Sequence, residues 1–322
     1  MDPRRGKAVV ITGASSGIGA ATAEAFAADG ARLVLAARNA EALEDVAERC
    51  RHAGGEALVV PTDVTNAAAV THLAGRARDH LGVIDLWFSN VGIGAVGRFH
   101  EVPIEAHRRV IEANLIGHLN DAHAVLPIFI AQRRGVFVNM ISVGAFFPAP
   151  LAVAYSASKF GLRGMSEALR SELVDYPDIH VCDVYPTLVD TPAFRHSGNY
   201  LGNPVEVSGA MDPRHVARAV VGLADRPRNS IGVGAPVGLM KLAQFLGAAA
   251  TRRAIERSLD RSRRMPATAG NLFVPPAPAG GIDGGFRAQR PRHTLVAAAS
   301  LCGVAALFAG GAWLARRPAR SG

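Results

Sequence analysis

The sequence is poor in the residues that build disulfide scaffolds and structural metal sites. Only three of its 322 residues are cysteines, and they lie far apart, at positions 50, 182 and 302. Without a CxxC spacing or an even set of cysteines, neither a disulfide framework nor a zinc site fits. The 11 histidines show no HExxH spacing. We therefore expect no metal site, and we assign no chemistry to the histidines of one long helical stretch, His107, His118 and His123.

Charged residues are also few, at 19% of the chain, whereas hydrophobic residues make up 49%. This balance is typical of a globular protein and excludes wholesale disorder. The net charge of +8 could indicate nucleic acid or an anionic membrane as a partner, but no nucleic-acid motif accompanies it. We expect an intracellular protein, because the first strand-like run begins almost at the start and leaves no room for a signal peptide.

Short apolar runs alternate with helical stretches between residues 7 and 234. We expect strands over Lys7–Thr12, Arg32–Ala36, Ala57–Val60, Leu86–Ser89, Val136–Ile141, Ile179–Tyr185 and Ile231–Val233. We expect helices over Gly17–Ala28, Ala40–His52, Ala67–Leu81, Ile104–Gln132, Ala152–Val174 and Pro213–Leu223. This alternation predicts a doubly wound α/β domain over residues 1–235, with a parallel sheet of about seven strands covered by helices on both faces.

A glycine-rich turn joins the first expected strand to the first helix, with the sequence Thr12-Gly13-Ala14-Ser15-Ser16-Gly17-Ile18-Gly19. Glycines let the backbone turn sharply and let a pyrophosphate approach, and the helix N-terminus supplies unpaired N–H groups. Taken alone, the segment could be no more than a tight turn. No Gly-Lys-Ser/Thr follows, which excludes a phosphate loop of the NTPase kind. Its position at the first strand of a doubly wound pattern favours a dinucleotide site.

Together with motifs farther along, this turn resembles the TGxxxGxG motif of the short-chain dehydrogenase/reductase family. The resemblance covers residues 7–234 and includes a YxxxK motif, Tyr155 to Lys159, that begins 13 residues after Ser142. It implies a Rossmann-type fold and an oxidoreductase acting on CH–OH groups. It implies the catalytic residues Asn114, Ser142, Tyr155 and Lys159. It also implies that the cofactor contacts Gly13, Ser15, Ser16, Gly17, Ile18, Gly19, Asp63, Val64, Asn90, Gly92, Tyr155, Lys159, Pro186, Val189 and Thr191.

Two positions depart from the family pattern. Val91 stands where the family usually has alanine, and Thr187 stands where a glycine usually follows the proline. Neither change removes a catalytic group. Because Thr187 is implied to lie near the nicotinamide, we expect its bulk to reshape the pocket.

The end of the second expected strand bears on which dinucleotide binds. An acidic residue there would hold the ribose 2′-hydroxyl and select NAD. This strand instead runs on to Arg38, whose guanidinium can grip a 2′-phosphate in a bidentate manner. Arg38 can also be read as a solvated surface residue. A second basic residue is often found just before the second glycine of the glycine-rich turn, and here Ser16 occupies that position. NADP(H) is the favoured cofactor, ahead of NAD.

Hydride transfer between a nicotinamide and a carbonyl requires a proton donor at the oxygen. Tyr155 suits this role, but an ordinary tyrosine pKa of about 10 makes it too weak an acid near neutrality. Lys159 follows one helical turn later, so we expect its ammonium to lower the tyrosine pKa and to bond the nicotinamide ribose. Ser142 can hold the substrate oxygen, and the resemblance implies that Asn114 anchors a water that relays protons to Lys159. Taken alone, Tyr155 would be read as a half-buried aromatic residue.

The last quarter of the chain differs in composition from the α/β domain. Residues 236–264 read as one or two helices that end in a cluster of six arginines, a basic extension. Residues 265–293 contain five prolines and five glycines, which predicts a linker or an extended arm. Residues 294–315 are an uncharged run of 22 residues, and residues 316–322 form a basic tail.

The uncharged run has the length of a membrane-spanning helix. Arginines flank it and Trp313 lies near one edge, as interfacial anchors do. We expect a single-pass C-terminal anchor with the catalytic domain cytoplasmic, because soluble NADP is intracellular. Eight alanines and three glycines make the run weakly apolar, so a soluble helix packed on the domain or a partner subunit, in a cytoplasmic protein, stays open.

These observations predict an NADP(H)-dependent oxidoreductase that interconverts a ketone or aldehyde and an alcohol. We expect the loop 191–211 to form a substrate lid. Candidate lining residues are apolar and could equally belong to the core: Phe146, Phe147, Leu188, Phe194 and Tyr200. A catalytically idle NADP-binding protein or a membrane scaffold of the same fold stays open as an alternative. The family resemblance also suggests a homo-oligomer.

Overall fold

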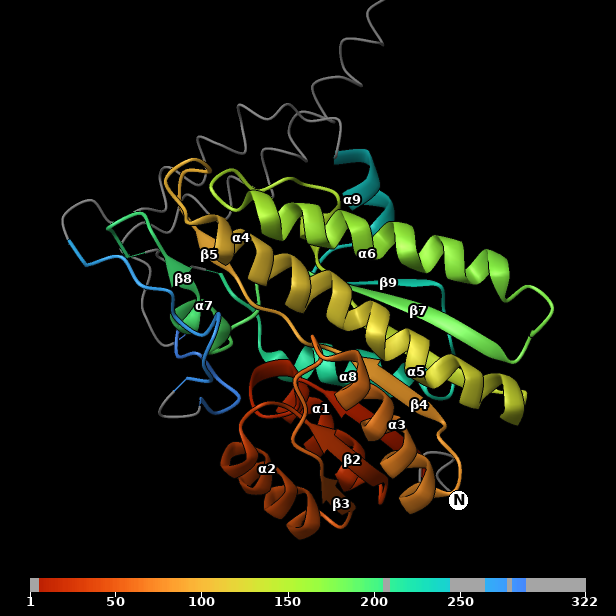
Figure 1. The fold of residues 1–322 in the computed structure, drawn as a ribbon. Helices are drawn as coiled ribbons and strands as arrows, with labels where there is room; N and C mark the ends of the chain where they lie inside the picture. Colours follow the sequence, from red (N-terminus) through yellow and green to blue (C-terminus); the bar gives the residue numbers. More distant parts are fainter. Residues whose placement is uncertain (1–5, 205–208, 244–263, 277–279, 288–322) are drawn as a thin grey trace, which may run out of the picture.

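A computed structural model describes residues 6–204, 209–243, 264–276 and 280–287 of the chain (Figure 1). Its main sheet has seven strands in the order β3-β2-β1-β4-β6-β7-β9, and all neighbouring pairs are parallel. The strands are β1 (Ala8–Thr12), β2 (Arg32–Ala36), β3 (Glu56–Val59), β4 (Leu86–Ser89), β6 (Gly135–Met140), β7 (Ile179–Pro186) and β9 (Ser230–Val233). The expected parallel sheet of an α/β fold is confirmed.

Helices cover both faces of this sheet (Figure 1). They are α1 (Gly17–Ala28), α2 (Ala40–His52), α3 (Ala67–Leu81), α4 (Ile104–Ile111), α5 (Gly117–Gln132), α6 (Val153–Glu172) and α8 (Pro213–Leu223). Side chains alternate between the faces of a strand, so each strand serves two cores. Val9 and Ile11 belong to the core under α1, α2 and α8, whereas Ala8 and Val10 belong to the core under α3 and α5.

Several helices begin at polar residues that cap them. Asn39 accepts a hydrogen bond from the Ala42 amide at the start of α2, and Asn66 caps α3 in the same way. Asp212 accepts from the Arg214 amide, and Pro213 occupies the first position of α8. Side-chain caps satisfy amides that lack a partner within the helix. The sequence therefore fixes these boundaries locally, and the expected bounds of α2, α3 and α8 match the structure.

The expected helical stretch Ile104–Gln132 is helical throughout, but its centre is not α-helical. A π-helical turn, η1 (Glu112–Ile116), separates α4 from α5, and it contains the fully buried Asn114. A π-turn inserts one residue into the helical register and often occurs at functional sites. Asn114 uses both ends of its amide on Ile93, accepting from its N–H at 2.8 Å and donating to its carbonyl at 2.9 Å.

A small second sheet lies in the region of the expected lid. Strand β8 (Gly198–Asn199) pairs in parallel with β5 (Ala95–Val96), and the short helix α7 (Ala193–His196) precedes it. We call the described residues 264–276 and 280–287 the arm. Figure 1 shows the arm in blue beside β8 and α7. An antiparallel bridge joins its Thr268 to Asn199, with backbone hydrogen bonds of 2.8 and 2.9 Å.

The rest of the C-terminal region lies mostly outside the described residues. Helix α9 (Val237–Ala243) begins within the expected helical extension. The arginine cluster, apart from Arg264, and the uncharged run 294–315 fall outside the described ranges. Within those ranges, no helix combines the length and the apolar character needed to cross a membrane. The domain boundaries stay predictions.

Candidate active site

The chain order of the strands reverses between β1 and β4, and ligands of doubly wound sheets bind at the carboxyl ends of the strands beside such a switch. Apart from Tyr155 and Lys159 on α6, the cofactor residues implied by the sequence lie at or just after the carboxyl ends of the strands. The turn 12–19 follows β1, Arg38 follows β2, and Asp63 and Val64 follow β3. Asn90 and Gly92 follow β4, whereas Pro186 ends β7 and precedes Val189 and Thr191.

The glycine turn has the backbone shape that a bound pyrophosphate requires. Gly13 and Gly17 have φ angles of +67° and +55°, in the left-handed region that side chains disfavour. A Cβ added to Gly19 would collide with the Gly13 carbonyl oxygen. A Cβ added to Gly92 would instead meet no atom within 4 Å. The turn is therefore close-packed against itself and borders open space, a cradle that fits a dinucleotide.

Loops after β4 and β7 border this turn. The Asn90 side chain donates to the Gly13 carbonyl at 3.2 Å, and the Asn90 amide donates to the Thr12 hydroxyl at 3.3 Å. The Thr191 side chain approaches Gly17, since a Cβ built there would lie 3.2 Å from it. The structure thus brings the glycine turn, Asn90 and Thr191, three of the predicted cofactor contacts, together.

The end of the candidate site near Arg38 and Asp63, where we expect the adenosine of the cofactor, contains more charged side chains than the sequence indicated. One carboxylate oxygen of Asp63 accepts from Arg109 at 2.8 Å, and the other accepts from the amide and hydroxyl of Thr65 at 3.0 and 2.8 Å. Burial opposes ionisation, but these hydrogen bonds hold the pKa of Asp63 below its usual value. Asp63 is therefore an ionised acceptor. Sequence reasoning missed Arg109, which lies 46 residues along the chain on α4.

The predicted catalytic residues meet at the carboxyl end of β6. Ser142 follows that strand, and its hydroxyl is hydrogen-bonded to the phenol of Tyr155 on α6. Lys159 lies one turn later, is 3% exposed, and donates to the Met140 carbonyl at 3.0 Å. Its ammonium lies 5.8 Å from the centre of the Tyr155 ring. A buried amine, a phenol and a hydroxyl thus share one corner of the site.

Burial governs the electrostatics of this corner. Burial raises the pKa of Tyr155, although the hydrogen bond with Ser142 works in the opposite direction. Burial also lowers the pKa of Lys159 to about 7, because a charged amine loses its hydration there. Desolvation of the phenol dominates here, and the lowering of the tyrosine pKa by Lys159 stays a prediction. A tyrosine with a raised pKa keeps its proton at neutral pH.

The comparisons with known proteins agree with this geometry. The family model described as short chain dehydrogenase matches residues 7–200. The chain belongs to the short-chain dehydrogenase family. It is 30% identical over 261 residues to the uncharacterized oxidoreductase YxnA of Bacillus subtilis (strain 168). The aligned region covers 79% of this chain and 73% of YxnA. It is 33% identical over 193 residues to dehydrogenase/reductase SDR family member 7 of Homo sapiens. The aligned region covers 59% of this chain and 57% of the human protein.

A solved structure is similar to this short-chain dehydrogenase in fold. It is the alcohol dehydrogenase from the archaeon Thermococcus sibiricus complexed with 5-hydroxy-NADP, with a TM-score of 0.62 and 28% identity. The match covers 70% of this chain and 95% of that one. The Rossmann-type fold and membership in an oxidoreductase family, both expected from the sequence, are confirmed.

Asn114 is linked by hydrogen bonds to the corner of this short-chain dehydrogenase that holds Ser142, Tyr155 and Lys159. Besides its two bonds to Ile93, its amide donates to the Ser158 hydroxyl at 3.3 Å. That hydroxyl donates in turn to the Tyr155 carbonyl at 2.7 Å. The Asn114 side chain therefore ties the loop after β4 to the tyrosine turn of α6. Its role in a water relay stays a prediction.

Two buried titratable residues near the site were not assigned a role from the sequence. The ring nitrogens of His118 lie 2.6 Å from the Asn139 oxygen and 2.8 Å from the Val91 carbonyl, and burial lowers its pKa to about 4. In its neutral state the ring has one N–H and can donate to only one of these oxygens, and His118 is a buried core residue to which we assign no chemistry. Asp121 accepts from the Thr12 and Ser89 hydroxyls at 2.8 and 2.7 Å. Burial raises the pKa of Asp121 to about 7.

The five candidate lining residues divide into different environments. Phe146 is 1% exposed and packs on Tyr185, with ring centres 4.9 Å apart, so it belongs to the core. Leu188 and Phe194 are exposed, whereas Phe147 and Tyr200 are partly buried. Phe194 makes an edge contact with Phe286 of the arm. Thr187, which departs from the family pattern, packs its side chain against Gly234. A Cβ added to Gly234 would collide with the Thr187 hydroxyl.

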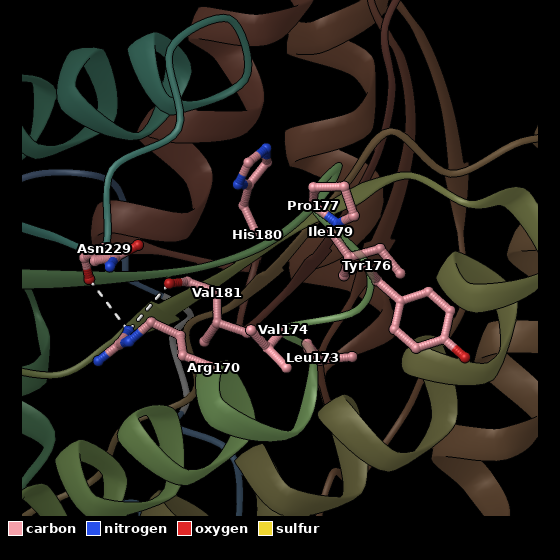
Figure 2. A pocket seen from close by; sticks show the side chains of 9 residues that line it. All are labelled: Arg170, Leu173, Val174, Tyr176, Pro177, Ile179, His180, Val181 and Asn229. Atoms are coloured by element: carbon pink, nitrogen blue, oxygen red, sulfur yellow. Dashed lines mark hydrogen bonds between the residues drawn. The ribbon is translucent and has the colours of Figure 1, made fainter.

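A hollow at the opposite end of the sheet is separate from this site. Figure 2 shows it beside the start of β7, between Arg170 and Tyr176. The Arg170 guanidinium is already bonded to the carbonyls of Val181 and Asn229 and to the buried Asp183. Its charge is therefore used within the protein, and the hollow offers no group directed at a ligand.

Proposed function

We propose that this short-chain dehydrogenase uses NADP(H) to interconvert a ketone or aldehyde and the matching alcohol, with an apolar substrate. The meeting of Ser142, Tyr155 and Lys159 beside the glycine turn carries this proposal. A catalytically idle binding protein or scaffold has no need for a buried lysine and a hydroxyl arranged around one phenol. Burying an amine costs free energy, and such costs are typical of active sites.

The cofactor, when bound, supplies or accepts the hydride at the substrate carbon. The protein handles the proton. In reduction, Ser142 holds the carbonyl oxygen and Tyr155 donates its proton to it, and the raised tyrosine pKa keeps that proton in place until then. Lys159 exchanges its proton near neutral pH, because its pKa is about 7, and so can help to resupply the phenol.

The preference for NADP(H) over NAD is supported by the adenosine end. The end of β2 carries no carboxylate that would repel a 2′-phosphate. Burial and repulsion from the neighbouring Arg109 both lower the pKa of Arg38, and the Asp63 carboxylate offsets part of this effect. A dianionic phosphate would relieve this repulsion. The Thermococcus sibiricus neighbour was solved with an NADP derivative.

A membrane location is a separate part of the proposal. It depends on the uncharged run 294–315, which lies outside the described residues, and on the arginines that flank the run. The catalytic domain would then face the cytoplasm, with the chain anchored at its C-terminus. A cytoplasmic protein is the alternative.

A screen of ketones, aldehydes and alcohols with NADPH and NADP tests the proposed reaction. With a substrate identified, Tyr155→Phe should lower kcat at least about 1,000-fold while the Kd for NADPH changes less than about threefold, because only the proton donor is lost. Tyr176→Phe is a matched control, since Tyr176 lies at the other end of the sheet. If Tyr155→Phe kept most of its kcat, the assignment of the proton donor would be wrong.

A further inference from the structure

The arm lies across the adenosine end of the candidate site. Its backbone carbonyls at residues 271–273 all accept hydrogen bonds from the guanidinium of Arg38. One terminal nitrogen donates to Asn271 at 2.8 Å, and the other donates to Leu272 and Phe273 at 3.4 and 3.3 Å. The two terminal nitrogens form the fork with which an arginine grips a phosphate. In this structure the arm occupies that fork.

The part of the arm beside Arg38 is held by the buried side chain of Leu272. Leu272 is 0% exposed and belongs to a cluster of buried residues with Ile93, Ala106 and Val110. Its carbonyl also accepts from Arg109 at 3.0 Å, so one arm carbonyl lies between two guanidinium groups. These carbonyls present partial negative charge where the sequence predicts that the cofactor presents its 2′-phosphate.

A second contact anchors the far part of the arm. Asp190 accepts from the amides of Phe286 and Arg287 and from the Arg287 guanidinium, at 2.9 to 3.2 Å. The Gly281 carbonyl accepts from the Gly17 amide at 3.1 Å. The arm can therefore leave Arg38, and give up the Gly17 amide to a pyrophosphate, while Asp190 still holds Phe286 and Arg287.

The docked arm also contains an uncompensated polar atom. The side-chain oxygen of Asn271 is buried and has no hydrogen-bond partner among the described residues. A buried acceptor without a partner costs free energy that release to water would recover. This weak point lies beside Arg38, so the contact is suited to exchange for a stronger ligand.

We propose that residues 271–273 of the arm compete with the 2′-phosphate of NADP(H) for Arg38 and thereby set the selectivity between NADP(H) and NAD(H). The inference rests on the proposed function, since it takes Arg38 as the 2′-phosphate site. NADPH must displace these carbonyls before Arg38 can grip its phosphate. NADH has no group that requires Arg38, so it needs to displace only the Gly281 carbonyl from the Gly17 amide, which NADPH must displace as well. The docked arm therefore weakens NADPH binding selectively.

Leu272→Ser in the full chain tests this competition. It removes the buried contact and should lower the Kd for NADPH about tenfold, which corresponds to about 1.4 kcal/mol of lost docking free energy. The Kd for NADH should stay within about twofold. Val274→Ser is the matched control, because Val274 lies on the same arm with 68% of its surface exposed. Cofactor fluorescence measures both constants. An unchanged or higher Kd for NADPH in Leu272→Ser would overturn the proposal.

Hydrogen exchange of the unmodified chain gives a readout that does not depend on a variant folding. The Thr268 amide donates to Asn199, and the Asn271 amide donates to His196. Adenosine 2′,5′-bisphosphate should speed exchange at both amides, whereas adenosine 5′-monophosphate, which lacks the 2′-phosphate, should not. Slower exchange with the bisphosphate would mean that the arm closes over the ligand, and the proposal would be wrong.

The same measurements distinguish the two levels of inference. If NADPH binds and is oxidised by substrate but the arm amides do not respond to the bisphosphate, only the competition is wrong. If neither dinucleotide binds to the wild-type chain or to Leu272→Ser, the proposed function fails and the competition fails with it.

Discussion

Asp121 offers a quantitative test of the structure beneath the cofactor turn. It is fully buried on α5, and one of its oxygens accepts hydrogen bonds from Thr12 on β1 and Ser89 on β4. The other oxygen has no hydrogen-bond partner among the described residues. Burial raises the pKa of this carboxyl from 3.8 to about 7 in the folded protein. The folded state therefore prefers the protonated acid.

The sign of the pH dependence follows from this raised pKa. Below about pH 4 the carboxyl is protonated in both states, so it contributes no difference. Between about pH 4 and pH 7 the unfolded chain ionises while the folded protein keeps its proton, and each pH unit costs the folded state about 1.36 kcal/mol. Applied to these two pKa values, linkage predicts that ionisation of Asp121 lowers the free energy of unfolding by about 2.6 kcal/mol between pH 5 and pH 8.

Asp121→Asn removes the ionisation and keeps an oxygen for Thr12 and Ser89. Urea unfolding at pH 5 and pH 8 gives the change in the free energy of unfolding for each protein. From pH 5 to pH 8, the free energy of unfolding of the variant should rise by about 2.6 kcal/mol relative to that of the wild type, because the other groups titrate alike in both proteins. The exposed carboxylate Asp45 on α2, replaced in Asp45→Asn, provides the control. Equal pH dependence in Asp121→Asn and the wild type would refute the raised pKa.

Two further predictions concern the cofactor and the C-terminus. Arg38→Ala should raise the KM for NADPH by one to two orders of magnitude, roughly the loss of a charge-assisted pair of about 1.5–3 kcal/mol, and should leave NADH kinetics nearly unchanged. Equal weakening for both cofactors would contradict a role in selecting the 2′-phosphate. Deletion of residues 294–322 should move the protein from the membrane to the soluble fraction with NADPH binding intact, and Ala305→Arg, which costs about 2.5–3.5 kcal/mol on the insertion scale, should do the same. Recovery of the full-length chain in a carbonate wash would exclude the anchor.

Local signals were enough to predict most of the fold. The expected bounds of β2, β4, α1, α2, α3 and α8 agree with the structure, because buried apolar runs and capping residues are written in the adjacent sequence. The catalytic corner was also predictable, since a YxxxK spacing places two side chains on one helix face. What the sequence could not show is burial. It shows that Lys159 neighbours Tyr155, but only the packed structure shows that desolvation raises the pKa of the phenol and lowers that of the amine.

The contacts that sequence reasoning missed join residues far apart in the chain. Arg109 meets Asp63 across 46 residues, and Arg38 meets Asn271 across 233. An extended segment rich in proline and glycine has no periodicity that could reveal its path, and its backbone carbonyls are the same at every position. Yet such carbonyls are the groups that bind Arg38 here. Arg38, from which the sequence predicts NADP(H), is therefore a residue whose availability depends on a segment more than 200 residues away, and the affinity of the protein for NADPH has to be measured with the arm present.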